Sequence, residues 1–327
     1  MAQLTVHTEI ICENYDFYAE RGKVIPVLKS NGYGLGMVKL LEVLRDERNV
    51  SLFACSRPSE ALTLAGRGAQ ILLLSPEYEP EVLRGLLEKQ VILSVESLSQ
   101  AEQISALQIP AEVHIAVDTG LGRFGFLPEQ EEDIRKVFSL PNLHVCGIFS
   151  HFADSNQERQ KENFFGLLEK LKDLPLGIRH LASTHSSARE DCRLDAVRVG
   201  SGLTGMVDGL RHAAEFTGKI CTVRTMKKGS TVGYSGIRLK RDSAVAVIEA
   251  GTGDGAFTYR SCGPRTWLRM RKQYVLVSGQ QAPVLGFPGL THTEIDVTGI
   301  DCKPGDLAVL SQSPVMVSGS VPVIYTK

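Results

Sequence analysis

The sequence lacks an excess of charge, a long apolar run and a pattern of paired cysteines. Its 327 residues carry 36 Lys and Arg against 37 Asp and Glu, so no basic surface suited to nucleic acid is expected. No apolar run reaches the roughly 18 residues of a membrane span, and the N-terminal segment has no basic and apolar leader pattern. The seven cysteines are odd in number and include no CxxC pair, which disfavours a disulfide framework and a zinc site. We therefore expect a cytoplasmic protein without a nucleic-acid partner, a membrane partner or a metal.

Short apolar segments alternate with amphipathic segments between residues 24 and 205. The candidate strands are residues 24–29, 51–56, 70–75, 91–96, 112–120, 144–152, 178–184 and 196–201. Each of the first seven is followed by a possible helix, and the helix that begins near residue 156 places Phe164, Leu167, Leu168 and Leu171 on one face. Apolar strands separated by helices form parallel sheets. Eight such units predict an α/β fold with a closed (β/α)8 TIM-type barrel, and an open doubly wound sheet is the alternative.

The pattern changes after residue 215. Segments rich in Val, Ile and Thr are separated there by Gly, Pro and Asp, with little helical periodicity. This composition predicts a smaller, mostly antiparallel β domain. The expected domains are therefore residues 1–215, the barrel, and residues 216–327, the β domain.

Barrel enzymes place their functional side chains at the carboxyl ends of the strands. Lys29 closes the first predicted strand, where partial burial would lower its pKa and favour an imine with an aldehyde. A lysine that merely extends to solvent is the alternative. The glycines of NGYGLG (31–36) either contact a phosphate or only turn the chain.

Two further strand ends carry polar side chains. Arg123 follows the fifth predicted strand, where it would bind a carboxylate or pair with an acidic side chain. His151 ends the sixth strand, and we favour a packing or stacking role because no second ligand lies at metal-binding spacing.

The last two predicted strands end in hydroxyl side chains and glycines. Ser183 and Thr184 end the seventh strand, and Arg198, Gly200 and Ser201 end the eighth. Backbone N–H groups and hydroxyls there would form an anion site, and barrels often bind phosphate after strands seven and eight. Ordinary capping of a turn or helix is the alternative.

Six segments, in order, resemble those of one enzyme family. They are VIPVLKSNGYGLG, VHIAVDTGLGRFGF, GIFSHFADS, HLASTHSS with VRVGSGLTG, TVGYSG and EAGTGDG. On these motifs the chain resembles the alanine racemase-like, fold-type III family of pyridoxal 5'-phosphate (PLP)-dependent enzymes over nearly its whole length. The resemblance implies a racemase that acts on a free, small-molecule amino acid. It also implies a head-to-tail homodimer in which the β domain of one copy completes the active site of the other.

The resemblance implies a role for each matching residue. Lys29 would carry the cofactor and act as one base, and Tyr234 of the second copy would act on the opposite face of the substrate Cα. The remaining cofactor-binding residues would be Tyr33, Ser183, Thr184, Gly200 and Ser201 for the phosphate, and His151 and Arg198 for the ring. Arg123, Leu290 and Thr291 would bind the substrate.

Several positions depart from the family pattern. Thr252 stands where the family has a tyrosine, and Leu290 and Thr291 replace a Met-Asp pair that lines the substrate pocket. Ala116 stands where some members have a lysine, and Gly319 stands where a phosphate-contacting tyrosine is common. These replacements predict a roomier pocket rim and a substrate other than alanine.

Two other functions are alternatives. A fold-type III amino acid decarboxylase would need a cysteine-centred acidic motif, and SCGPRTW around Cys262 lacks the acidic neighbours. A non-catalytic PLP-binding homeostasis protein would have the barrel alone, whereas this chain has a second domain that carries Tyr234.

Overall fold

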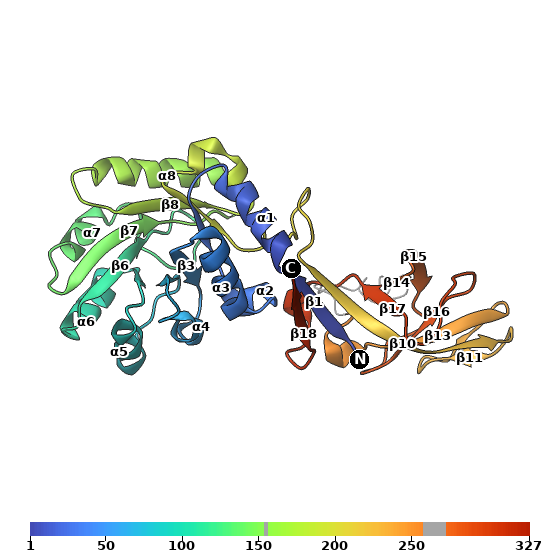
Figure 1. Ribbon diagram of the computed structural model, residues 1–327. Helices are drawn as coiled ribbons and strands as arrows, with labels where there is room; N and C mark the ends of the chain where they lie inside the picture. The colour runs from blue at the N-terminus through green and yellow to red at the C-terminus, as the bar shows by residue number, and fades with distance from the viewer. Residues whose placement is uncertain (154–155, 258–272) are drawn as a thin grey trace. The chain divides into compact units, whose positions relative to one another are not determined.

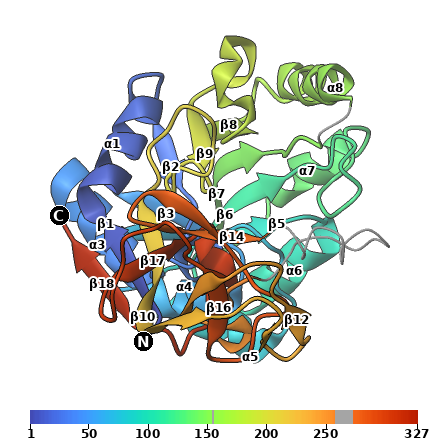
Figure 2. The same ribbon diagram turned by 90° about the vertical axis from the view of Figure 1, so that its right-hand side faces the viewer.

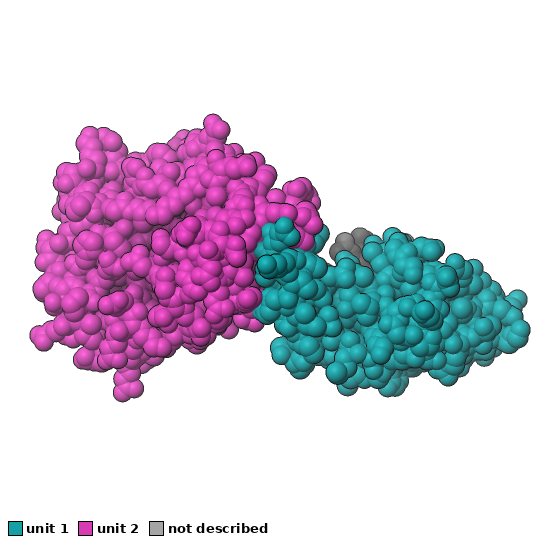
Figure 3. Space-filling model, in the orientation of Figure 1, with its two compact units in different colours: residues 1–9, 212–327 teal, residues 10–211 magenta. Residues whose placement is uncertain are grey.

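The computed structural model describes residues 1–153, 156–257 and 273–327, and the chain divides into two compact units (Figure 3). The barrel unit contains Ile10–Arg211, and the β unit contains Met1–Glu9 and His212–Lys327. This division differs from the expected boundaries of 1–215 and 216–327, because the first strand belongs to the second unit. Strand β1 (Gln3–His7) pairs antiparallel with β10 (Ala214–Met226) and parallel with β18 (Val323–Thr326).

The barrel unit contains a closed ring of parallel strands (Figure 1). The strands are β2 (Val24–Pro26), β3 (Leu52–Cys55), β4 (Gln70–Leu73), β5 (Leu93–Val95), β6 (Ala111–Ala116), β7 (Leu143–Phe149), β8 (Ile178–Ser183) and β9 (Ala196–Val199). One sheet runs in the order β2-β9-β8-β7-β6-β5, and β3 pairs with β4. The bridges Val27–Ala54 and Leu72–Ile92 join these two sheets into a barrel. The predicted barrel is therefore confirmed, and the open sheet is wrong.

Helices cover the outside of the barrel, except for the short α2, which follows the carboxyl end of β2. The helices are α1 (Thr8–Ala19), α2 (Lys29–Tyr33), α3 (Met37–Arg48), α4 (Pro58–Leu64), α5 (Pro80–Glu88), α6 (Leu98–Ala106), α7 (Glu131–Val137) and α8 (Gln157–Lys170). The predicted apolar face of α8 is confirmed, because Phe164, Leu167, Leu168 and Leu171 are all buried. Since these side chains recur at helical spacing, one face of α8 is removed from water while the opposite face stays polar.

The segment after β8 differs from the expected helix. Two 3-10 turns follow β8, η1 (Ser186–Ala188) and η2 (Glu190–Cys192). The Ser186 hydroxyl accepts a hydrogen bond from the backbone N–H of Ser183 at 2.9 Å, and the Ser187 hydroxyl donates to the carbonyl of Thr184 at 2.8 Å. Such local bonds compete with the regular helical ladder. The hydroxyl-rich sequence therefore holds this segment as a tight turn beside the ends of β8 and β9.

The β unit is built on one large, mostly antiparallel sheet. Its remaining elements are β11 (Thr231–Val232), β12 (Ile237–Arg238), β13 (Ser243–Glu249), β14 (Tyr274–Val277), β15 (Gln280–Pro283), β16 (Thr293–Asp296) and β17 (Leu307–Leu310), with 3-10 turns η3 (Thr252–Asp254) and η4 (Pro314–Met316). The β11–β12 hairpin lies beside β16 (Figures 1 and 2). It packs through a cluster of Val232, Leu239 and Val245. Across the described part of the chain, no helix combines the length and apolarity needed to cross a membrane.

The burial of α8 gives a stability prediction. Phe164 is fully buried, whereas its neighbour Phe165 is 38% exposed. Phe164→Ala removes buried apolar surface and leaves a cavity, so we expect the free energy of unfolding of the barrel unit to fall by about 3–5 kcal/mol. The matched control Phe165→Ala should lower it by no more than about 1 kcal/mol. Urea unfolding followed by circular dichroism measures both, and equal losses would contradict the assigned burial.

Candidate active site

Lys29 lies just beyond the first barrel strand, in an unusual backbone turn. Strand β2 ends at Pro26, so Lys29 does not close the strand as predicted; it begins α2 instead. The next four residues, 30–33, have left-handed φ values of 54°, 54°, 64° and 55°. Only glycine and, less readily, asparagine adopt this conformation at low cost. The Asn31-Gly32 pair explains the centre of the turn, while Ser30 and Tyr33 must be held there by other contacts.

Glu60 supplies such a contact, which the sequence analysis missed. This side chain is buried at the start of α4. Its carboxylate accepts hydrogen bonds from the backbone N–H of Ser30 at 2.6 Å, and of Ser56 and Arg57 at 3.1 Å each. One carboxylate thus ties the Lys29 turn to the end of the neighbouring strand β3. The hint in the sequence is the position of this Glu near the start of a helix.

The environment of Lys29 shifts its amine toward the neutral form. Burial lowers the pKa of Lys29, and the positive charges of Arg123 and Arg198 lower it further, while Glu60 opposes them. The Lys29 Nζ lies 5.8 Å from the ring centroid of Tyr33. A neutral amine is the form that reacts with an aldehyde. The Lys29 amine, just beyond the carboxyl end of β2, is therefore shifted toward the form that an aldehyde requires.

Arg198 is a buried cation in strand β9, with only 4% of its surface exposed. Its terminal nitrogens donate to the carbonyls of Ser150 at 2.7 Å, His180 at 2.9 Å and Leu181 at 3.2 Å. They also contact Nδ1 of His180 at 2.7 Å and Nδ1 of His151 at 3.1 Å. None of its hydrogen bonds to the described residues uses Nε. This guanidinium is therefore fixed rigidly and retains one donor for a ligand.

Three histidines around Arg198 are held neutral. Burial and the charge of Arg198 lower the pKa of His151 and of His114 to about 3, and they also lower the pKa of His180. His114 Nδ1 lies 2.9 Å from His180 Nε2, so a chain of contacts runs from β6 through β8 to Arg198. The predicted strands contained His114 and His180, but their pairing was missed. Two polar residues inside otherwise apolar strands were the available signal.

Thr184, Gly200 and Tyr33 meet at the ends of β8 and β9. The hydroxyl of Thr184 accepts hydrogen bonds from the backbone N–H of Gly200 at 3.1 Å and of Gly202 at 3.4 Å. A Cβ on Gly200 would lie 2.3 Å from the hydroxyl of Tyr33, so only glycine permits this approach. Burial raises the pKa of Tyr33 to about 12, which keeps its hydroxyl protonated as a donor. The predicted phosphate residues therefore converge, and Ser183 and Ser201 lie in the same two segments.

Arg123 lies in a loop that is organised by one carboxylate. Asp118 accepts hydrogen bonds from the backbone N–H groups of residues 120 to 123, at 2.8–3.1 Å. The Arg123 guanidinium lies over the Phe124 ring, 4.7 Å from its centroid. Its positive charge acts on both Lys29 and His151. The lysine that in some family members is carbamylated and supports this arginine aligns with Ala116, which is buried here.

The remaining predicted residues lie in the β unit. Tyr234 occupies the turn between β11 and β12, and 91% of its surface is exposed. A Cβ on Gly289 would lie 3.3 Å from Cε2 of Tyr234, so the tyrosine adjoins the segment that carries Leu290 and Thr291. Thr252 also reaches this segment, because its hydroxyl donates to the Gly289 carbonyl at 3.2 Å. The predicted pocket-rim residues thus form one corner of the β unit.

Gly319 and Cys262 are the other two residues that the sequence analysis singled out. Gly319 follows Ser318, whose backbone N–H donates to the carbonyl of Asp254 at 3.0 Å. Cys262, on which the decarboxylase alternative depends, lies outside the described residues.

Comparison with known proteins adds an independent result. The family model for the alanine racemase N-terminal domain matches residues 6–208, and the model for the alanine racemase C-terminal domain matches residues 213–320. Alanine racemase 1 of Clostridium acetobutylicum is 28% identical over 316 residues, covering 88% of this chain and 79% of the relative. The alanine racemase of Thermodesulfovibrio yellowstonii is 29% identical over 292 residues, covering 85% and 76%.

Solved structures agree in fold. An alanine racemase from Clostridium difficile 630 superposes with a TM-score of 0.87 at 23% identity, over 99% of this chain and 95% of that chain. The alanine racemase from Bacillus anthracis with bound L-Ala-P gives 0.85 at 22% identity, over 100% and 95%. The match to the C-terminal family model is not expected of a barrel-only PLP carrier. The chain belongs to the alanine racemase family, whose members are PLP-dependent amino acid racemases.

Proposed function

We propose that this protein racemises a free amino acid with two acid/base groups, Lys29 of one copy and Tyr234 of a second copy. The observation that carries the proposal is the Lys29 amine, whose pKa is lowered by burial and by Arg123 and Arg198. Racemisation requires proton removal from one face of Cα and proton return to the other face. Lys29 serves one face, and the phenol of Tyr234 serves the opposite face.

The residues in the barrel mouth fit PLP. Lys29 offers an amine for the aldehyde, and Tyr33, Thr184 and Gly200 form a cradle for the phosphate, with Ser183 and Ser201 beside it. Arg198 retains an Nε–H donor for the ring nitrogen, and His151 is neutral and suited to packing on the ring. When bound, PLP withdraws electrons from the substrate Cα and makes its hydrogen acidic.

The chain's own residues then control where protons go. Burial and the charge of Arg123 lower the pKa of Arg198 to about 9, and that value still leaves the guanidinium protonated near neutral pH. Arg198 therefore donates a hydrogen bond without giving up its proton, which disfavours protonation of the ring nitrogen and side reactions such as transamination. Arg123 orients the substrate carboxylate as a charged donor. Proton transfer is left to Lys29 and Tyr234.

A head-to-tail homodimer is part of the proposal. Tyr234 is almost fully exposed on its own β unit, which is unusual for an acid/base group that must act away from water. A second copy that covers this corner would bury the phenol and bring it to a barrel mouth. We also propose a cytoplasmic location, because no disulfide joins the six described cysteines, as is typical of a reducing compartment.

The substrate is proposed to be larger than alanine. Thr252, Leu290 and Thr291 replace the tyrosine and the Met-Asp pair of the family pattern at the corner beside Tyr234. Leu290 is 72% exposed, and the two threonines are short. A rim made of these side chains would leave more room beside the substrate Cβ.

Mixing of two inactive variants tests the shared site. Tyr234→Phe should lower the racemisation rate by about 10²–10⁴-fold, because one acid/base group is lost. Lys29→Ala should abolish turnover. In a head-to-tail dimer, a heterodimer of the two variants contains one complete site, so activity should return on mixing under subunit exchange.

The matched control for Tyr234 is Tyr274→Phe, which changes another partly exposed tyrosine of the β unit and should keep full activity. Activity is measured as loss of optical rotation with a single enantiomer. Failure of the mixed variants to recover activity, despite exchange shown by mass spectrometry, would contradict the shared site.

A panel of the twenty amino acids tests the substrate proposal and the carrier alternative together. Chiral chromatography should show faster racemisation of at least one residue with a longer side chain than of alanine. Thr252→Tyr should narrow the range toward alanine, because it restores a bulky rim side chain. Activity confined to alanine would remove the substrate proposal. PLP binding without Cα–H exchange in D₂O for any amino acid would favour the carrier.

A further inference from the structure

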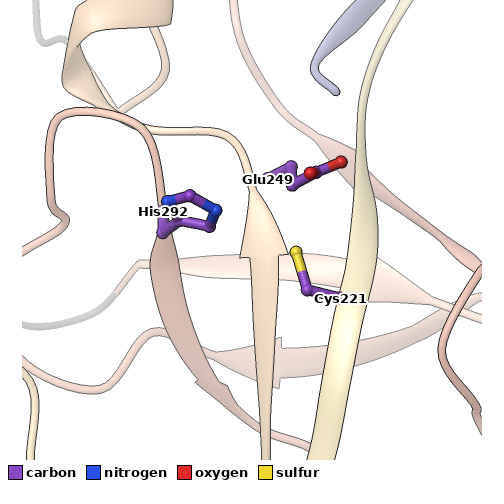
Figure 4. A group of neighbouring side chains, drawn as sticks. All are labelled: Cys221, Glu249 and His292. Atoms are coloured by element: carbon purple, nitrogen blue, oxygen red, sulfur yellow. The ribbon is translucent and has the colours of Figure 1, made fainter.

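Three potential metal ligands lie close together in the β unit, and none of them is assigned to the cofactor (Figure 4). Cys221 lies in β10, Glu249 ends β13, and His292 directly precedes β16. One ligand atom from each lies within 4.8 Å of the other two. Short ligand spacing in the sequence gives no signal for this group, because the three residues come from separate strands.

We propose that Cys221, Glu249 and His292 bind a divalent cation of the zinc type. Thiolate sulfur, imidazole nitrogen and carboxylate oxygen are the donors that Zn²⁺ takes in proteins, most often in a tetrahedral arrangement. Three protein donors leave a fourth position for water. Donor atoms around tetrahedral Zn²⁺ are roughly 3.5 Å apart. The three donor atoms must therefore move about 1 Å closer to one another, and small rotations of surface side chains allow this movement.

The backbone holds these residues in place independently of any ion. In the antiparallel pair of β10 and β13, Glu249 lies opposite Lys219. The pair of β13 and β16 ends with Ile248 opposite Thr293, so the next residues in this register, Glu249 and His292, also face each other. Cys221 is the extra residue of a β-bulge between Ile220 and Thr222. A bulge redirects a side chain out of the regular alternation. Here it leaves the thiol beside the carboxylate of the neighbouring strand.

A hydrogen bond also prepares the imidazole. The Thr291 hydroxyl lies 3.0 Å from Nδ1 of His292. When Nδ1 carries the proton and donates to this hydroxyl, Nε2 keeps a free lone pair for a metal. Histidine ligands of metals almost always have such a partner on the other ring nitrogen.

The charges around the group are mixed. Glu249 supplies a negative charge, and the Met1 ammonium group and Lys219 act on it as positive charges. The ammonium group of Met1 forms an ion pair with Glu249, so a positive charge already occupies one side of the group. A divalent cation would replace this ammonium group, and the Cys221 thiol would release its proton to solvent on binding.

The consequence of binding would be structural. The cation would connect β10, β13 and the turn before β16, a turn that is also fixed by the bond from the N–H of Gly289 to the carbonyl of His292 at 3.0 Å. Leu290 and Thr291 lie in this turn. Cation binding itself does not depend on their assignment to the substrate pocket.

The test uses the PLP-loaded full-length protein after chelation and removal of the chelator. Co²⁺ is added without oxygen, and the absorbance difference against the same protein without Co²⁺ is recorded. We expect about one Co²⁺ per chain, a near-ultraviolet band from thiolate to cobalt, and displacement of Co²⁺ by Zn²⁺. Zn²⁺ should also raise the thermal unfolding midpoint, because it binds the folded state.

Three variants separate this site from other thiols. Cys221→Ser should abolish the thiolate band. Loss of a residue that only hydrogen-bonds a metal ligand weakens metal binding by roughly 10-fold to 100-fold, so loss of the Cys221 ligand itself should weaken Zn²⁺ binding by more than that. Glu249→Gln should weaken binding but keep the band. The control Cys302→Ser removes another partly buried thiol of the same unit and should change neither quantity.

Unfolding midpoints in chelator show whether each variant is folded. A wild-type protein without the thiolate band, or a band that survives Cys221→Ser, would overturn the proposal. So would Zn²⁺ affinity that is unaffected by both Cys221→Ser and Glu249→Gln.

Discussion

A concentration of positive charge in the barrel mouth is the constraint on which the proposed chemistry depends. Lys29, Arg123 and Arg198 act on one another electrostatically, and Glu60 is the carboxylate that opposes them at Lys29. Like charges in a partly desolvated site lower each other's pKa. In the proposed mechanism, the same field that shifts Lys29 toward a neutral amine would attract the phosphate of PLP and the carboxylate of a substrate. Binding and activation would then arise from one arrangement of cations, held by the ends of the barrel strands.

The two units divide the chemistry between them. The barrel unit supplies the amine, the anion cradle and the fixed guanidinium of Arg198. The β unit supplies an exposed phenol, Tyr234, beside a turn that carries Leu290 and Thr291. Neither set of residues can place two acid/base groups on opposite faces of one carbon by itself. In the proposed dimer, variation in the turn of the β unit would alter substrate size while the cation cluster of the barrel stays constant.

Apolar periodicity predicted much of the fold, and the polar residues at the strand ends indicated which side chains would lie together. The eight strands were predictable because each is a short apolar run, and the contact of Thr184 with Gly200 because hydroxyls and glycines follow the last two strands. The left-handed turn after Lys29 and the role of Glu60 were not predictable, since they depend on contacts between neighbouring strands. The N-terminal strand was also missed. Its partners lie at the other end of the chain, beyond the range of local patterns.

The pH dependence of PLP capture by the cofactor-free protein tests the central claim most directly. Only the neutral Lys29 amine attacks the aldehyde, so the capture rate, normalised to acetyl-lysine, should reach half its maximum below the ordinary lysine pKa of about 10.4. Arg123→Gln removes a like charge and should move this midpoint to higher pH, whereas the half-buried control Arg135→Gln, at an arginine paired with Asp173, should not. A wild-type midpoint at the ordinary lysine value, or one unchanged by Arg123→Gln, would contradict the account.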